Sequence, residues 1–477
     1  MSVLIIFFFL TLMLIIYLTY WIKKWRNPKC IGVLPPGSMG LPIIGESLQL
    51  LIPNYSLDLH PFIKRRINRY GPIFRSNVAG HPIVFSADSE FNHYVVNQER
   101  RLVEFWYLDT YSKLFVLEGE SSTSGATAYI HKYIRSLFLN HFGNEKLKEN
   151  FLPQIQDVVN KILHSWSSQE FTEVKRSASS EFQAFTAKFL LGYDAEKSSY
   201  KMGESFAKFL ETLLAFPLNI PGTPYRQSLE VKKKIMNTLE NLLKERSNST
   251  EETNEEDVLD HMLKDMEKEK FITKDFIIQV LFGSLFAVSE SVPVIIALLF
   301  KFLSENPSVV EELMAEHEKI LKSNGSDSPI TWDQYKSMKF TSHVIQETLR
   351  ISNVTPGVMR RAIRDIQYKG YTIPAGWTIM LLASACHMNS ETFKDPLVFN
   401  PWRWNDLDSK CISKNFTPYG GGTRQCAGAE YSKVFLSIFL HVLVTKYRWT
   451  YIKEGKLCRR PMLLFGDGIH IKLHEKN

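Results

Sequence analysis

The segment from Thr417 to Gly428 contains the residues best suited to chemistry. It reads Thr-Pro-Tyr-Gly-Gly-Gly-Thr-Arg-Gln-Cys-Ala-Gly, so three glycines precede a single cysteine, Cys426, and an apolar run follows it. Glycines allow a backbone to approach a flat cofactor closely. Backbone amides and the start of the next helix can lower the pKa of a cysteine. Arg424 can pair with an anionic group of such a cofactor. By itself, the segment also fits a buried structural cysteine in a tight turn.

Two upstream segments supply an acid and two bases at a defined spacing. Glu347-Thr-Leu-Arg350 lies in a helix-forming stretch, where residues three apart share a face and can pair. Most isolated pairs of this kind are solvated surface bridges. The stretch from Asp395 to Trp404 adds Arg403 as a third member.

These three segments, in this order and spacing, resemble the cytochrome P450 family, and the resemblance extends over the whole chain. It implies a mainly α fold, in which a large helical domain carries small β-sheets, and a haem cofactor. It implies that Cys426 is the axial iron ligand and that Arg424 contacts a propionate. Glu347, Arg350 and Arg403 would then hold the loop that presents the thiolate.

Two weaker matches concern the other haem contacts. His131 and Arg135, four residues apart, resemble the family's pair on the second propionate, although an ordinary exposed basic helix has the same pattern. Arg360 matches a further propionate contact. Because Arg361 is adjacent, the sequence alone does not choose between them.

The segment that corresponds to the family's oxygen-activating helix departs from the usual pattern. Glu290 keeps the acid, Ser291 replaces the usual threonine but keeps the hydroxyl, and Val288 stands where glycine is common. The resemblance implies that Ser291 and Glu290 help to deliver protons. Pro293 has no N–H and its ring clashes with the carbonyl of Ser289. We hypothesise that it opens the helix as glycine would, the alternative being a kink unrelated to dioxygen.

The resemblance implies a monooxygenase that uses dioxygen and electrons from NADPH-cytochrome P450 reductase to oxidise a C–H bond of a hydrophobic substrate. The alternatives are an oxygen-independent isomerase or dehydratase, against which Glu290 and Ser291 argue, and a haem-binding scaffold without turnover. The segments 216–224 and 368–374 are similar to plant members that act on triterpenoids, sterols and brassinosteroids, which predicts a triterpenoid or sterol substrate. The expected pocket residues, which could equally be core residues, are Phe105, Trp106, Tyr107, Phe115, Phe216, Ala287 and Phe465.

The first residues of the chain predict a membrane anchor. Residues 3–21 are uncharged and just long enough to span a bilayer, and Lys23, Lys24 and Arg26 follow at once. This predicts a single-pass protein of the endoplasmic reticulum membrane whose catalytic domain faces the cytosol. A cleaved signal peptide would need a preceding basic residue, a shorter run and a small-residue cleavage site, which are missing. Residues 22–45 form a basic, proline-rich hinge, and residues 46–477 the catalytic domain.

Composition narrows the possible functions of this 477-residue chain. The five cysteines are irregularly spaced without a CxxC pair, which argues against a disulfide framework and a structural zinc site. The net charge of +7 suits an acidic protein partner or an anionic membrane, and no dense basic block suggests nucleic acid.

The pattern of apolar and turn-forming residues predicts the secondary structure. It predicts a hairpin between Phe74 and Phe85, helices over 131–350 with an exposed loop at 245–257, strands over 354–380, a helix over 429–445 and short final strands.

Overall fold

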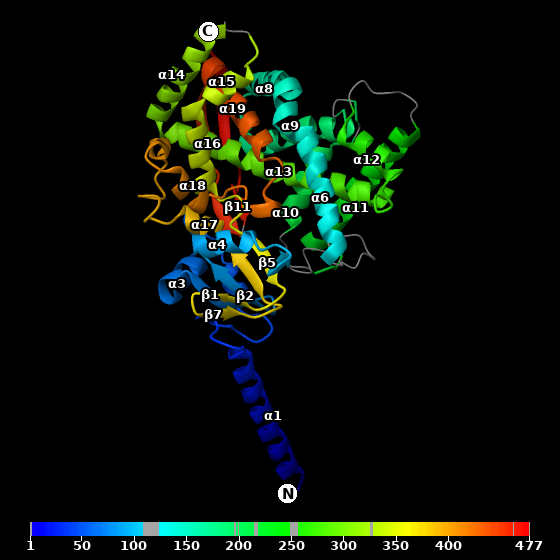
Figure 1. Ribbon diagram of the computed structural model, residues 1–477, viewed down its shortest axis with the longest axis vertical. Helices are drawn as coiled ribbons and strands as arrows, with labels where there is room; N and C mark the ends of the chain where they lie inside the picture. Colours follow the sequence, from blue (N-terminus) through cyan, green and yellow to red (C-terminus); the bar gives the residue numbers. More distant parts are fainter. Residues whose placement is uncertain are drawn as a thin grey trace.

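The computed structural model describes residues 2–107, 124–194, 197–198, 200–213, 218–248, 256–324, 328–460 and 462–476. A single helix stands apart from a large, mostly helical globule, and a smaller β-rich part lies between them (Figure 1). The mainly α architecture predicted from the sequence is confirmed. Phe115, Phe216 and most of the predicted loop at 245–257 lie outside the described residues.

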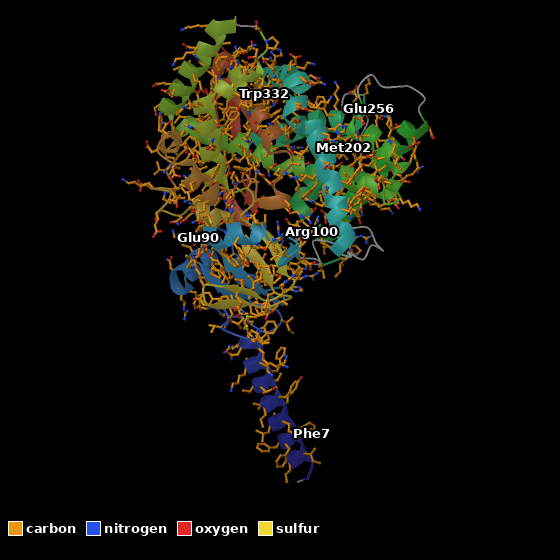
Figure 2. All side chains as sticks on the ribbon, in the orientation of Figure 1. Phe7, Glu90, Arg100, Met202, Glu256 and Trp332 are labelled. Atoms are coloured by element: carbon orange, nitrogen blue, oxygen red, sulfur yellow. The ribbon has the colours of Figure 1, made fainter. Side chains whose placement is uncertain are left out.

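The isolated helix is α1 (Ser2–Arg26), which is apolar on all sides. Its side chains, Phe7 among them, project outward without a protein neighbour around most of its length (Figure 2). The stretch Ile5–Arg26 is long and apolar enough to cross a membrane. A helix that is hydrophobic all round needs an apolar environment. This helix is therefore a possible membrane anchor.

A five-stranded sheet forms the β-rich part. Its strands, in spatial order, are β1 (Ile73–Val78), β2 (His81–Ser86), β8 (Thr378–Leu381), β5 (Val358–Ala362) and β3 (Val103–Phe105). The predicted hairpin is confirmed, because β1 and β2 pair antiparallel around a turn in which Ala79 and Gly80 have positive φ. Around this sheet lie α2 (Ser47–Leu50), α3 (Pro61–Tyr70), α4 (Ser89–Val96) and the hairpin of β6 (Ile366–Tyr368) and β7 (Tyr371–Ile373).

The helical part begins at Ser124. Its elements are α6 (Ser124–Phe142), α7 (Asn144–Lys146), the π-helical turn η1 (Leu147–Phe151), α8 (Leu152–Ser167), α9 (Val174–Leu191), α10 (Met202–Leu213), α11 (Pro224–Asn248), α12 (Val258–Met266), α13 (Lys274–Glu305), α14 (Pro307–Asn324), α15 (Trp332–Ser337) and α16 (Lys339–Ser352). The loop predicted at 245–257 starts too early, because α11 continues to Asn248 with Leu243 buried one turn before.

The last part of the chain returns to the middle of the globule. It contains α17 (Ala383–His387), the 3-10 turns η2 (Pro401–Asn405) and η3 (Gly422–Arg424), α18 (Ser409–Asn415) and α19 (Ala429–Lys446). It closes with β9 (Tyr447–Lys453), β10 (Cys458–Arg460), β11 (Met462–Leu464) and β12 (His470–Glu475). Here β12 pairs with β9 and with β4 (Thr172–Glu173). The predicted helix over 429–445 and the short final strands are confirmed.

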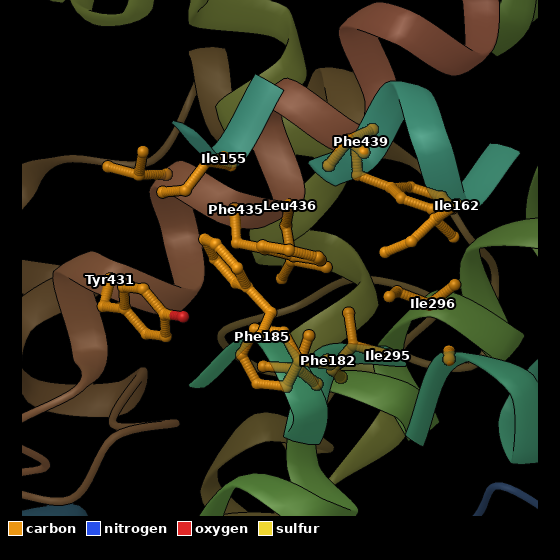
Figure 3. Packing of buried hydrophobic residues seen from close by; sticks show 14 of the residues in the cluster. Ile155, Ile162, Phe182, Phe185, Ile295, Ile296, Tyr431, Phe435, Leu436 and Phe439 are labelled. Carbon is orange, nitrogen blue, oxygen red and sulfur yellow. The ribbon is translucent and has the colours of Figure 1, made fainter. Parts of the chain in front are cut away.

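The core lies where α9, α13 and α19 pack together (Figure 3). Phe182 of α9 meets Phe435 of α19 edge-on, with ring centroids 4.6 Å apart, and Ile295 of α13 lies beside them. Burying such a side chain contributes about 1.5–3 kcal/mol. Although α13 is also long and apolar enough to cross a membrane, 61% of its most apolar window is buried inside the globule. It is the central core helix, and one of its faces borders the site.

Candidate active site

A cavity of about 1570 Å³ separates α13 from the glycine-rich loop and the first turn of α19. Single ligand pockets hold about 300–1,000 Å³, so this one has room for a cofactor and a substrate together. One stripe of α13 borders it, because four lining residues are spaced four apart: Gln279, Gly283, Ala287 and Ser291. On the opposite wall lie residues 416–422 and 424–428, which include the loop.

Cys426 sits in this loop with its side chain facing the cavity. Its N–H donates to the carbonyl of Tyr419 at 2.9 Å, which closes the loop just before α19 begins. Burial has the largest effect on the pKa of this thiol and raises it overall. As expected, a backbone group at Gly428 lowers that pKa, and Arg135 also lowers it, but by less than burial raises it. Coordination to a metal cation would deprotonate the thiol outright.

A second cysteine, Cys386 of α17, also lines the cavity. Its Sγ donates to the carbonyl of Ala87 at 3.6 Å and accepts from Asn92 at 3.5 Å, and its pKa is raised to about 11 by burial. Cys386 is thus a buried thiol whose sulfur already forms hydrogen bonds with other residues. Cys426 has the glycine loop and the open space beside it, so it is the better candidate for a ligand.

The two arginines of the upstream segments, Arg350 and Arg403, both pair with the buried carboxylate of Glu347. Arg350 donates from Nε and Nη2 to the two carboxylate oxygens of Glu347 at 2.9 and 2.8 Å, and neither side chain is exposed. Arg403 donates to Glu347 at 2.9 Å, and its remaining nitrogens reach the carbonyls of residues 394, 395 and 398. Trp404, which sequence reasoning missed, adds an N–H at 3.1 Å. Removing one partner of such a buried pair is strongly destabilising.

His387 connects this cluster to the cysteine loop and was also missed. Its carbonyl accepts from Arg350 at 2.9 Å, and its Nε2 accepts the N–H of Thr417, the first loop residue, at 3.0 Å. The ring proton must then lie on Nδ1, which donates to Asn353 at 2.8 Å. Asn353 is the left-handed residue, with φ of 41°, that ends α16. A neutral His387 therefore ties the loop to the helix of Glu347 and Arg350.

We expect this tie to make the loop sensitive to acid. Burial first, and Arg350 second, lower the pKa of His387 from 6.5 to about 3. The unfolded chain therefore binds the proton first, so the stabilisation is complete above pH 6.5 and is lost as the pH falls toward 3. His387→Gln should flatten the dependence of the melting temperature on pH between about 6 and 4. It should flatten it only in part, because the buried His317 and His441 have pKa values lowered to about 3 and about 4. An unchanged slope would contradict the role of His387.

Basic side chains gather at the edge of the cavity below the loop. Arg424 and Arg360 both pair with Glu99, whose side chain is 6% exposed, at 3.2 and 2.9 Å. Arg135 donates to the carbonyl of Gln425, and His131 lies close enough to Arg424 and Arg135 that burial and these cations lower its pKa to about 4. Two arginines thus share one carboxylate, and a third arginine binds the adjacent loop backbone, which leaves a local excess of positive charge suited to an anionic cofactor.

Arg360 and Arg361, which the sequence left as alternatives for a propionate contact, differ in their ion-pair partners. Arg360 is buried and points to Glu99, whereas Arg361 forms a half-exposed ion pair with Glu104 at 2.6 Å. Only Arg360 therefore belongs to the cationic cluster.

Some of the predicted pocket residues line the cavity and others do not. Tyr107 and Ala287 line the cavity. Phe105 does not line it, because its ring packs against the guanidinium of Arg424, 4.8 Å away. Trp106 turns toward His81, with ring centroids 5.4 Å apart, and Phe465 is buried in the main core. In the described part of the chain these three rings do not line the cavity, because a contact between distant segments decides where each ring points.

Glu290 and Ser291 both border the cavity from α13 but face different partners. Ser291 is exposed to the cavity, and among the described residues its hydroxyl donates only a 3.3 Å bond, to the carbonyl of Ala287. Glu290 is buried and forms an ion pair of 2.9 Å with Lys175 of α9. The hydroxyl is therefore available to a molecule in the cavity, and the neighbouring carboxylate is paired with a partly exposed lysine.

Gly283 offers a test of the cavity's role. A Cβ added there would meet no heavy atom within 4 Å, and the residue is not at positive φ. Gly283→Leu should therefore fold and load its cofactor normally, with a gain of up to about 1 kcal/mol in helix propensity. It should still lose most substrate binding, measured as at least a tenfold rise in the concentration needed for a substrate-induced spectral change. Unaltered substrate binding would exclude this part of the cavity from the substrate site.

The arrangement defines a class of protein: a helical enzyme whose cysteine loop and neighbouring arginine cluster border a space suited to a flat anionic cofactor. The cytochrome P450 family model matches residues 35–469. The chain belongs to the cytochrome P450 family, and its cofactor is a haem whose iron carries a cysteine thiolate. It is a monooxygenase of that family. The family generally uses a redox partner and hydrophobic substrates.

Two similar relatives are named as hydroxylases. A beta-amyrin 16-alpha-hydroxylase of Maesa lanceolata is 50% identical over 463 residues, 97% of each chain. A cucurbitadienol 11-hydroxylase of Siraitia grosvenorii is 50% identical over 468 residues, 98% of each chain. The solved structure of a retinoic acid-bound cyanobacterial CYP120A1 has a TM-score of 0.81 at 22% identity and covers 94% of this chain and 100% of its own. That structure supports the fold alone.

Proposed function

We propose that the protein hydroxylates a C–H bond of a triterpenoid or sterol with electrons from NADPH-cytochrome P450 reductase. The observation that carries the proposal is the large cavity, which is lined mainly by apolar side chains, in a chain half identical over nearly its whole length to two triterpenoid hydroxylases. A rigid polycycle fits such a space because it loses little conformational freedom on binding. The acid and hydroxyl on α13 favour this function over an oxygen-independent isomerase or a scaffold.

Each residue of the site has a defined task in this proposal. Cys426 would hold the iron of the haem, and Arg424, Arg360, His131 and Arg135 would hold its propionates. Bound there, the haem would supply dioxygen activation and insertion of one oxygen atom into a C–H bond. The apolar lining orients the substrate and excludes water. Ser291 donates a hydrogen bond into the cavity and passes a proton, and Glu290, paired with the partly exposed Lys175, connects that hydroxyl to solvent.

The direct test is turnover with a reductase and a panel of precursors. The chain is co-expressed with a plant reductase, and beta-amyrin, cucurbitadienol and cholesterol are supplied separately, with products identified by mass spectrometry. We expect one of these skeletons to gain a single oxygen atom in a reaction that needs NADPH. Substrate-dependent rearrangement without NADPH would favour the isomerase, and a haem spectrum without turnover of any skeleton would favour the scaffold.

We further propose that residues 3–21 anchor the protein in the endoplasmic reticulum membrane, with residues 22–45 as a hinge and residues 46–477 as a cytosolic catalytic domain. Lys23, Lys24 and Arg26 end α1, as the positive-inside rule requires for a cytosolic end. Six large apolar side chains close to the anchor are exposed and would contact lipid: Leu41, Ile43, Ile44, Leu48, Leu51 and Ile52.

Deletion of residues 1–22 should therefore release the protein from membranes only in part. The exposed apolar side chains at 41–52 should retain a fraction, which Ile43→Ser combined with Ile52→Ser should reduce further. Fractionation after the deletion measures both effects, and the reduced carbon monoxide spectrum confirms an intact haem domain. In sealed microsomes, added protease should digest the globule. Protection of the globule, or a glycan on Asn415, would refute the orientation.

A further inference from the structure

Pro293 interrupts the hydrogen bonding of α13 beside the candidate proton-delivery residues. It lies inside the helix, buried, twelve residues before the end at Glu305. A proline has no N–H to give to the carbonyl four residues earlier, which here belongs to Ser289. Ser289 is fully buried, so water cannot replace the missing donor. A buried carbonyl almost always finds another partner.

The partner comes from α9. The hydroxyl of Ser179, itself 5% exposed, donates to the carbonyl of Ser289 at 2.8 Å. One turn further along α9, Gln183 donates to the hydroxyl of Ser289 at 3.0 Å, and that hydroxyl donates to the carbonyl of Leu285 at 2.5 Å. The carbonyl that Pro293 frees is thus satisfied by a side chain of a neighbouring helix.

The donors on α9 form one polar stripe within an otherwise apolar contact. Lys175, Ser179 and Gln183 are spaced four apart and reach Glu290 and Ser289. Next to them on α9, Phe182 and Phe185 belong to the apolar core that also contains Ile295 and Ile296 of α13 (Figure 3). The polar contacts of the stripe with α13 are made at residues 289–290, within the turn that Pro293 disturbs.

Ser291 lies within this disturbed turn. Ser289 faces α9 whereas Ser291 faces the cavity, and its hydroxyl makes only the long bond to Ala287. The backbone between Ser289 and Pro293 consequently decides where the Ser291 hydroxyl points. Serine lacks the second Cβ substituent that restricts threonine, so its own rotamer preference contributes less.

We propose that Ser179 is a positioning residue for Ser291: Pro293 frees the Ser289 carbonyl, Ser179 holds it against α9, and together they present the Ser291 hydroxyl to the cavity. The proposal rests on the proposed role of Ser291. It makes Pro293 and Ser179 an interdependent pair, because each has its effect through the same carbonyl.

A double-mutant cycle tests the pair in the full-length holoenzyme. Ser179→Ala leaves the Ser289 carbonyl without a donor, which should lower the folded-to-unfolded ratio roughly tenfold and reduce product formed per NADPH. Pro293→Ala supplies the helix N–H again, so adding Ser179→Ala to Pro293→Ala should change stability little. Ser180→Ala is the matched control, because Ser180 is the exposed neighbour on α9. Stability comes from thermal unfolding, and coupling from product, NADPH and peroxide.

The outcomes separate this proposal from the proposed function. One outcome is that Ser179→Ala lowers the stability of the parent enzyme and of the Pro293→Ala variant by the same amount. In that case the two residues act independently and the inference is wrong. If the cycle is interdependent but Ser179→Ala stays fully coupled while Ser291→Ala does not, Ser179 does not position Ser291. If Ser291→Ala also stays coupled, the stability cycle still supports the pair, and it is the proposed role of Ser291 that fails.

Discussion

Cys426→Ser should abolish the carbon monoxide spectrum that is characteristic of a thiolate-ligated haem. A serine hydroxyl is a far weaker ligand for iron and cannot donate electron density as a thiolate does. The loop itself should survive, since the Cys426 N–H still reaches Tyr419 and the side chains are nearly equal in size. The measurement is the reduced carbon monoxide difference spectrum, together with the haem-to-protein ratio of the purified variant.

Cys386→Ser is the matched control, because this second cysteine also lines the cavity and is the more deeply buried of the two. Its sulfur already contacts Ala87 and Asn92, and a serine hydroxyl can take over both contacts. The variant should keep the thiolate spectrum, as should serine variants of Cys30, Cys411 and Cys458. A thiolate spectrum that persists in Cys426→Ser and disappears in Cys386→Ser would transfer the ligand to α17.

Local patterns in the sequence predicted the parts of the site that are continuous in the chain. The glycine-cysteine loop, the i,i+3 pair of Glu347 and Arg350, and the adjacent pair of Glu290 and Ser291 are each contained within a dozen residues. Arg403 could be added because its segment recurs with the pair in a known family. Helix and strand periodicity sufficed for the mainly α fold and the first hairpin, since each depends on neighbouring residues.

Contacts between distant segments could not be predicted in this way. Glu99 meets Arg424 across 325 positions, and His387 meets Thr417 only because α17 packs against the loop. Similarly, the sequence indicated that Pro293 would free the carbonyl of Ser289 but gave no sign that Ser179, 110 positions earlier, would bind it. Aromatic residues near the site were assigned to the pocket by type, and the packing around Trp106 and Phe465 decided otherwise.

Ser291→Ala should keep consuming NADPH while it loses product. Substrate binding and the first electron transfer make no demand on the hydroxyl, so the spectral change on substrate addition should persist. Delivery of protons to the reacting oxygen does require a donor in the cavity, and the Ser291 hydroxyl has only a long bond to Ala287 to give up. Loss of a positioned proton donor typically costs roughly 10²-fold or more on the chemical step. The electrons taken from NADPH should then be released in hydrogen peroxide instead of being used to form product.

Ser291→Thr completes the test, because it keeps the hydroxyl and adds the methyl group that restricts its rotamer. Coupling should hold or improve, unless the methyl collides with the substrate, in which case the spectral change on substrate addition weakens as well. Product, NADPH consumed and peroxide released are measured for both variants beside the parent enzyme. Full coupling in Ser291→Ala would mean that protons bypass this hydroxyl. Since Ser289 is buried and already bonded to α9, they would have to travel through water held by the substrate.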